Sequence, residues 1–307
     1  MHPAPSIIVF TTLSGFGYGL AAVLGVGLLD PAFIATKIAH VLMLALISAG
    51  LLSSTLHLGN PQRAWRALSQ WRSSWLSREG VMAIVTFVPL LISAWASLFD
   101  SRYLKLPGLL GAAGAATTVC CTAMIYASLK SIDAWHTWLT PVCYLLFAAT
   151  GGVLVAGLMR MLMPAPLDSG LSIAAVVLLA AAWGAKIAWW RRLRSLQPLS
   201  SPESATGLGF IGRVRLFERP HTNDNYLTRE MGYRIARKHA SKLSRLAVIY
   251  GGAAPAALVA LAPIAGQGPT VGLFHLAATL LFGLGVAVER WLFFAEARHA
   301  VMNYYGG

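Results

Sequence analysis

The stretch "VMAIVTFVPLLISAWASL" (residues 81–98) contains no charged side chain. Because the core of a bilayer is about 30 Å thick and needs roughly 20 apolar residues per helix, this stretch predicts a membrane-spanning helix over residues 80–99. The rest of the chain has the same character: 57% of its 307 residues are hydrophobic and only 11% are charged. A typical soluble domain has about 25% charged residues. The sequence therefore predicts an integral membrane protein.

Seven further segments are long and apolar enough to span a membrane. Backbone polar groups must pair internally in lipid, so each of these segments is expected to be a helix. We predict an all-α fold, a single membrane domain formed by a bundle of eight transmembrane helices. The first segment has no Lys or Arg before its apolar run, which favours a retained helix over a removed signal peptide. The predicted spans are 6–29, 33–56, 80–99, 107–129, 139–163, 170–190, 246–265 and 270–296.

The spacing of glycines in two of these segments indicates close helix packing. Small residues let helix backbones approach one another in a membrane. The residues concerned are Gly15, Gly17 and Gly19 in the first segment and Gly111 and Gly114 in the fourth.

The positive charges are unequally divided between the two sides of the predicted bundle. The side of the two termini carries 18 Lys and Arg, whereas the opposite side carries 4. Cytoplasmic loops of membrane proteins are enriched in Lys and Arg, so we expect both termini in the cytoplasm and the chain in a bacterial inner membrane. By the same rule, the net charge of +13 belongs to the loops. We therefore expect no nucleic-acid partner.

The connection at about 191–245 is the longest between the predicted spans, and it is basic. From Asn223 onward its apolar residues recur with a helical period, and cations lie between them. A basic amphipathic helix of this kind can lie on an anionic membrane surface or dock an acidic partner subunit, and both alternatives stay open. The apolar positions are Tyr226, Leu227, Met231, Ile235 and Leu243.

The cysteines argue against a metal centre in this chain. Cys120, Cys121 and Cys143 have no metal-ligand spacing. An iron–sulfur cluster needs about four thiolates. We therefore predict no iron–sulfur cluster and no metal site.

One short connection is much more polar than its surroundings: "STLHLGNPQRAWRALSQWRSSWLSREG" (residues 54–80). His57 ends the second predicted helix and Glu79 begins the third, so both are expected at the same cytoplasmic rim. A histidine that titrates near neutrality beside a carboxylate suits two-proton redox chemistry at a quinone. The alternative is structural, because tryptophans are common at membrane interfaces and a glutamate stabilises a helix N-terminus. The candidate quinone site is His57 and Glu79 with Trp65, Trp71 and Arg78, and Trp75 as a further wall.

Two other functions remain possible from the residues alone. His40 and His275 lie at similar depths near the opposite face, where two imidazoles could hold a haem. Glu289, Arg290 and Glu296 in the last span could form an internal ion pair along a transport path. A secondary transporter is therefore an alternative to a redox anchor.

Four segments together resemble the integral membrane anchor subunit of the DMSO reductase type, and the resemblance covers nearly the whole chain. It implies eight helices and a role in menaquinol binding for the residues here numbered His57 and Glu79. The segments are "HPAPSIIVFTTLSGFGYGL" (2–20), "STLHLGNPQRAWRAL…SWLSRE" (54–79), "MIYASLKSIDAWHTWLTP" (124–141) and "HTNDNYLTREMGYRIARKHA" (221–240).

The resemblance also implies an assembly. One partner is catalytic and holds a molybdopterin cofactor, a second partner holds iron–sulfur clusters, and the anchor exchanges electrons with the quinone pool without a haem of its own. The anchor then has no substrate site beyond the quinone site. The segment "DAWH" (133–136) is expected beside the quinone site or at the docking surface, because it shares a face with His57.

The predicted topology departs from anchors that serve DMSO reduction, whose termini lie in the periplasm. Cytoplasmic sulfite dehydrogenases use a similar anchor beneath an inward-facing molybdoenzyme. The charge asymmetry therefore favours an anchor for sulfite oxidation that delivers electrons to quinone. The alternative is an outward-facing reductase of DMSO or another S- or N-oxide that oxidises menaquinol.

Overall fold

A computed structural model describes residues 3–56, 60–164, 169–196, 201–215, 217–218, 235–264 and 268–300. Within these ranges the chain forms helices and no strand, and eight helical segments are long and apolar enough to cross a membrane. The predicted all-α membrane fold is confirmed. The first six spans are α1 (Pro5–Gly25), α2 (Ile34–Thr55), α3 (Trp75–Asp100), α4 (Lys105–Ala127), α5 (Leu139–Arg160) and α6 (Ser169–Ser195). The seventh is built from α9 (Ile235–Val248), the π-helical turn η2 (Ile249–Ala253) and α10 (Ala254–Leu261), and the eighth is α11 (Pro269–Ala295).

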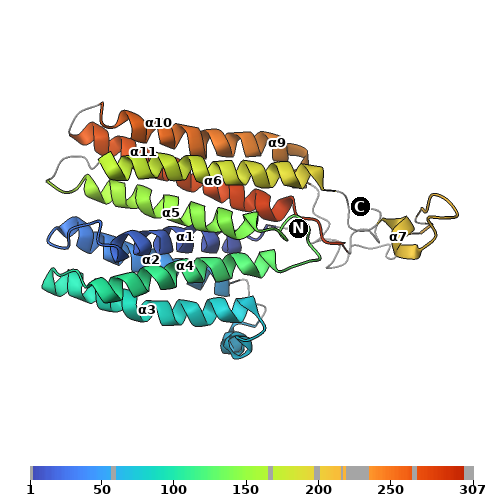
Figure 1. Ribbon diagram of the computed structural model, residues 1–307, viewed down its shortest axis with the longest axis horizontal. Helices are drawn as coiled ribbons and strands as arrows, with labels where there is room; N and C mark the ends of the chain where they lie inside the picture. Colours follow the sequence, from blue (N-terminus) through green and yellow to red (C-terminus); the bar gives the residue numbers. More distant parts are fainter. Residues whose placement is uncertain are drawn as a thin grey trace.

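The spans run along a common axis in alternating directions (Figure 1). The start of α1 and the end of α11 lie at one end of the bundle, which we call the terminal end. Two short elements also lie there: the 3-10 helix η1 (Pro61–Gln70) and the helix α7 (Pro202–Thr206). The long basic connection is therefore on the same side as the ends of the described chain.

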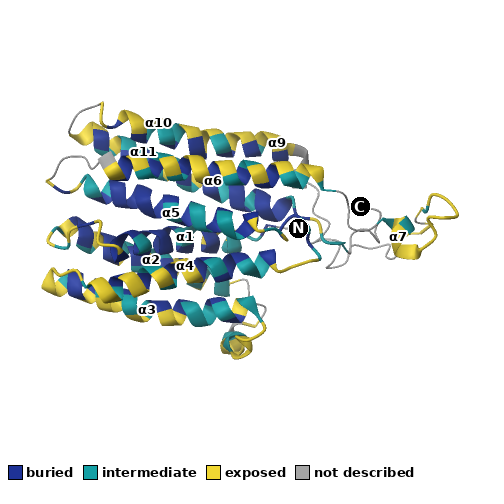
Figure 2. Cartoon of the chain, viewed as in Figure 1, coloured by how far each residue is buried: buried dark blue, intermediate teal, exposed yellow. Residues whose placement is uncertain are grey.

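The two central helices are α1 and α5. Within the apolar part of α5, 72% of the residues are buried, against 33% within that of α3, and Figure 2 shows the same contrast. The two helices touch at Gly19 and Gly152, where an added Cβ atom would collide with the backbone of the opposite helix. A glycine contact of this kind permits the closest approach of two helices.

Most of the predicted glycine contacts are present. A Cβ atom at Gly17 would lie 2.6 Å from the Ile47 side chain, and one at Gly111 would lie 2.8 Å from Leu90. Gly15 differs, because a Cβ atom there would meet no other atom within 4 Å.

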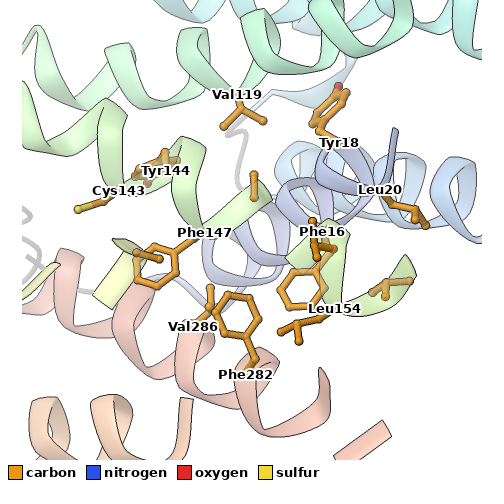
Figure 3. Packing of buried hydrophobic residues seen from close by; sticks show 14 of the residues in the cluster. Phe16, Tyr18, Leu20, Val119, Cys143, Tyr144, Phe147, Leu154, Phe282 and Val286 are labelled. Atoms are coloured by element: carbon orange, nitrogen blue, oxygen red, sulfur yellow. The ribbon is translucent and has the colours of Figure 1, made fainter. Parts of the chain in front are cut away.

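Aromatic rings fill the centre of the bundle, where α1, α5 and α11 meet. Figure 3 shows Phe16, Phe147 and Phe282 converging from these three helices. The ring centroids of Phe16 and Phe282 are 5.5 Å apart, and those of Phe147 and Phe282 are 6.1 Å apart. These spacings are typical of favourable aromatic pairs.

The third span begins at Trp75 rather than at residue 80, because the Ser74 side chain caps the helix and accepts a hydrogen bond from the Ser77 amide. Glu79 therefore lies one turn inside α3 and not at its first residue.

The helix that contains the seventh span begins at Ile235, and its segment apolar enough to cross a membrane is His239–Leu261, against the predicted 246–265. Most of the amphipathic segment predicted from Asn223 lies outside the described residues. From Ile235 onward the helix continues directly into the span and packs against α11. A buried stripe of small residues makes this packing possible: Ala240, Ser244, Ala247 and Gly251.

Candidate functional site

The carboxylate of Glu79 points into the bundle. Its side chain is 6% exposed, and the hydroxyl of Thr122 on α4 donates a hydrogen bond to it. The Thr122 hydroxyl also lies 3.1 Å from the Thr118 carbonyl oxygen of its own helix. An ionisable group at this position is costly to bury and is a functional candidate for that reason.

The other residues of the predicted quinone site are on the outside of the connection. His57 lies outside the described residues. Trp65 is 67% exposed and Trp71 is 53% exposed, so these indoles form part of the outer surface near η1. They are not gathered around the buried Glu79 carboxylate.

Arg78 stabilises the junction between η1 and α3. Its guanidinium donates hydrogen bonds to the carbonyl oxygens of Trp71 at 3.0 Å and Arg72 at 2.7 Å. It also lies 4.3 Å from the centroid of the Trp75 ring. Arg78 and Glu79 are adjacent in sequence, but Arg78 binds the connection whereas Glu79 faces α4.

A second group of buried charges lies between α6 and α11. The Lys186 ammonium is 2.6 Å from Glu289 Oε1, and an Arg290 guanidinium nitrogen is 3.5 Å from Glu289 Oε2. All three side chains are at most 2% exposed. We call Lys186, Glu289 and Arg290 the charged triad. The sequence pointed to Glu289 and Arg290, whereas Lys186 was missed, although a single lysine within an apolar span is itself a signal.

Aromatic rings surround the charged triad. The Lys186 ammonium lies 3.6 Å from the centroid of the Trp189 ring, and the Arg290 guanidinium lies 3.6 Å from that of Tyr144. Such cation–π contacts partly offset the loss of hydration. Glu296, grouped with this pair from sequence, lies just beyond the end of α11, where the Trp190 indole donates a hydrogen bond to it at 2.9 Å. Burial raises the pKa of the Glu296 carboxyl.

A narrow, partly open crevice with a free space of about 10 Å³ reaches from Thr122 on α4 to Arg290 of the charged triad. It lies between α1, α4, α5 and α11. Its polar lining includes Thr12, Thr122, Tyr144 and Arg290, and its apolar lining includes Phe16, Val119, Phe147 and Val286.

The two buried histidines have separate surroundings near the opposite end of the bundle. His40 lines a second pocket with Thr36 and Tyr103, and its Nδ1 lies 2.9 Å from the Thr36 carbonyl oxygen. His275 faces Gly157 on α5, and its Nδ1 lies 3.1 Å from the Val271 carbonyl oxygen. Within the described ranges, no group of three or more His, Cys, Asp and Glu side chains could hold a metal ion.

The segment at 133–136 lies at the terminal end of the bundle. The Trp135 side chain is buried, and its indole donates a hydrogen bond to the Phe293 carbonyl oxygen at 2.9 Å. His136 is exposed, and Arg192 of α6 donates hydrogen bonds to the carbonyl oxygens of Asp133 and His136. The turn between α4 and α5 is thus attached to α6 and α11, and it presents His136 on the surface.

Comparison with known proteins agrees with this architecture. The sequence profile of the DMSO reductase anchor subunit (DmsC) family matches residues 1–295. The chain is similar to one of the subunits of the sulfite dehydrogenase from Allochromatium vinosum, with 32% identity over 329 aligned positions that cover 99% of each chain. No solved structure matches it significantly. The chain therefore belongs to the DMSO reductase anchor subunit family, and it is the membrane anchor subunit of a molybdoenzyme complex.

Proposed function

We propose that this chain is the quinone-reactive anchor of a complex that oxidises sulfite in the cytoplasm. Similarity to a sulfite dehydrogenase subunit over 99% of both chains supports this substrate. The excess of Lys and Arg at the terminal end supports an orientation with both termini in the cytoplasm, in a bacterial inner membrane. Membership of an anchor family does not favour a transporter.

The partners are an iron–sulfur subunit and a molybdopterin catalytic subunit. They dock at the terminal end, where η1, α7 and the turn between α4 and α5 lie. Electrons from sulfite reach the membrane through the partner's clusters. The anchor then has to bring a quinone close to those clusters and supply it with protons.

The buried Glu79 carboxylate is the observation that carries this proposal. A quinone accepts two electrons and two protons when it is reduced to a quinol. His57 hydrogen-bonds a quinone oxygen, and Glu79, oriented by Thr122, passes protons from cytoplasmic water to the reduced oxygen. Trp65, Trp71 and Arg78 shape the interface of the connection through which the quinone approaches. Protons and electrons arrive from the same side, so turnover moves little net charge across the membrane.

The side chains that line the crevice beside Thr122 have the chemistry that a quinone head group requires. Quinone head groups are flat and apolar with two carbonyl acceptors, and the crevice beside Thr122 has apolar walls with buried hydrogen-bond donors. A site of mainly apolar lining with a few placed polar groups is typical for a small organic ligand.

The direct test uses the intact complex with His57→Leu and Glu79→Gln. Both variants are expected to assemble and to reduce an artificial dye with sulfite, while sulfite-dependent quinone reduction falls at least about 100-fold. Glu218→Gln is the matched control, because Glu218 is exposed. Unchanged quinone kinetics in both variants would remove His57 and Glu79 from the site.

A second experiment tests the assembly and its substrate. The complex is purified from native membranes through a tag on this chain, and its molybdenum, non-haem iron and haem are assayed. We expect molybdenum and iron without haem, together with sulfite-dependent quinone reduction. Quinol oxidation by DMSO with no response to sulfite would instead establish the reductase alternative.

A further inference from the structure

Polar atoms that line the crevice between α1, α4, α5 and α11 have unused hydrogen-bonding capacity. Tyr144 is 4% exposed and Arg290 is 2% exposed, and both line the crevice. The Arg290 Nε makes no hydrogen bond with any described residue. The Tyr144 hydroxyl is next to the Arg290 guanidinium, which can only donate, so the Tyr144 O–H has no acceptor among the described residues. Buried donors in this state are rare and costly. They therefore point to a ligand atom that can accept hydrogen bonds.

The charged triad explains why Arg290 has spare donors. Glu289 is the carboxylate of the triad, and Lys186 holds it at 2.6 Å, whereas Arg290 stays at 3.5 Å. Two cations thus share one carboxylate, which leaves a positive charge beside the crevice. A positive charge in such a low-dielectric site interacts strongly with negative charge that develops nearby.

The walls of the crevice are apolar and leave space next to α1. Phe16, Val119 and Phe147 line it. Gly15 also lines it, and a Cβ atom at this position would meet no other atom within 4 Å. The crevice is partly open and its free space is about 10 Å³, which is room for a single oxygen atom.

We propose that this crevice receives one carbonyl oxygen of the quinone, with the Tyr144 hydroxyl and the Arg290 guanidinium as hydrogen-bond donors. The assignment rests on the proposed function and names the residues that recognise the quinone oxygen. Thr122 lines the same crevice and bonds Glu79, so it connects the binding groups to the proton relay.

The chemical steps balance with the partner as the source of electrons. Two electrons from the partner's clusters enter the quinone, and negative charge develops on its oxygens. Arg290 stabilises that charge in the crevice. For the transfer, the Thr122 hydroxyl rotates its proton from Glu79 toward the reduced oxygen, and protonated Glu79 donates to the Thr122 oxygen. The hydroxyl then gives its own proton to the quinone oxygen and takes the one from Glu79. Cytoplasmic water supplies the second proton and reprotonates Glu79.

The first test compares two tyrosines that lie in one aromatic cluster. Tyr144→Phe removes only the hydroxyl that faces the crevice. Tyr126→Phe is the matched control, because Tyr126 packs against Tyr144 with ring centroids 6.0 Å apart but is not among the residues that line the crevice. We expect Tyr144→Phe to weaken equilibrium binding of a quinone-analogue inhibitor about three- to tenfold, the effect of one lost hydrogen bond, and to raise KM for quinone similarly. Tyr126→Phe is expected to leave both unchanged.

The second test fills the crevice without changing any polar group. Gly15→Val places two methyl groups beside the open space, and Gly184→Val makes the same change on the exposed face of α6, where a Cβ atom also meets no other atom within 4 Å. We expect Gly15→Val to reduce binding of the quinone analogue at least about tenfold, with dye-linked sulfite oxidation and thermal stability close to wild type. Gly184→Val is expected to bind the analogue like wild type.

The outcomes separate this inference from the proposed function. If Glu79→Gln abolishes quinone reduction while Tyr144→Phe and Gly15→Val bind the analogue like wild type, the quinone binds elsewhere and only the crevice assignment fails. If the wild-type complex binds no quinone analogue and reduces no quinone, the proposed function itself fails.

Discussion

The Lys186 ammonium lies 2.6 Å from Glu289 Oε1 across the interface of α6 and α11, and both side chains are at most 1% exposed. Arg290 shares the same carboxylate at 3.5 Å. These charges come from positions about 100 residues apart in the chain. One buried carboxylate therefore balances two cations, and the three residues do not contribute equally to stability.

Removing the shared carboxylate and removing one of the two cations are expected to lower the stability by different amounts. Glu289→Gln leaves two neighbouring cations buried without a counter-charge, and we expect the free energy of unfolding to fall by about 3–5 kcal/mol. Lys186→Met leaves Glu289 paired with Arg290 and should cost less. Thermal unfolding of the solubilised complex measures both. Equal losses in the two variants would contradict the shared-carboxylate arrangement.

The hydrogen bond from Thr122 to Glu79 predicts a selective kinetic effect. Thr122→Val removes the donor, and a hydrogen bond to a charged group is worth about 1.5–3 kcal/mol, so we expect quinone-linked turnover to fall about 10- to 100-fold. Thr117→Val is the control, because Thr117 is exposed on the same helix and its hydroxyl donates to the Ala113 carbonyl oxygen of that helix at 2.8 Å. Dye-linked turnover should be unaffected in both. A normal quinone rate in Thr122→Val would show that Glu79 needs no orientation by this hydroxyl.

The contact of α1 with α5 predicts that Gly19 tolerates no side chain. In Gly19→Ala the methyl group would collide with the Ala148 carbonyl oxygen, and overpacking of this kind costs about 1–3 kcal/mol or more. Gly184→Ala, which meets open space, should be neutral or stabilise the helix by up to about 1 kcal/mol. The yield of monodisperse protein and its thermal unfolding temperature measure the difference. The idea fails if Gly19→Ala matches Gly184→Ala.

The loop at 201–215 is expected to respond to acid. Hydrogen bonds from the Glu203 amide and the Ser201 hydroxyl lower the pKa of the Glu203 carboxyl, and the Val214 amide adds a third at 3.2 Å. Because the folded pKa is below the unfolded value of 4.5, this stabilisation is complete above pH 4.5 and is lost as the pH falls through the folded pKa. Hydrogen exchange of peptides from the loop should quicken over that window. Glu203→Gln should remove the pH dependence, and its persistence there would assign it to another group.

The orientation in the membrane is measurable with fusions after Gly307. We expect fluorescence from a reporter that matures only in the cytoplasm, because the excess of Lys and Arg lies at the terminal end. Alkaline phosphatase activity from the matching fusion, without fluorescence, would place that end in the periplasm. The outward-facing reductase would then be the better assignment.

The sequence by itself determined the fold class and nearly all spans. Each long apolar stretch such as residues 81–98 has to form a helix in lipid whatever its neighbours are, because its backbone groups find partners only within the helix. The glycines of the first and fourth spans likewise predicted close contacts, since only a missing side chain allows helix axes to approach so far. The buried Glu79 was also recognisable, as an ionisable group at the edge of an apolar run.

Only the tertiary structure decided which way these side chains face. The cap at Ser74 places Glu79 one turn inside α3, and the packing of α3 against α4 brings its carboxylate to Thr122. Likewise, hydropathy placed Lys186 and Glu289 within spans, but their pairing depends on which helices are neighbours and how each is rotated. Hydropathy measures how apolar a segment is, whereas a site forms where the faces of several helices meet, and that meeting is determined by packing between distant parts of the chain.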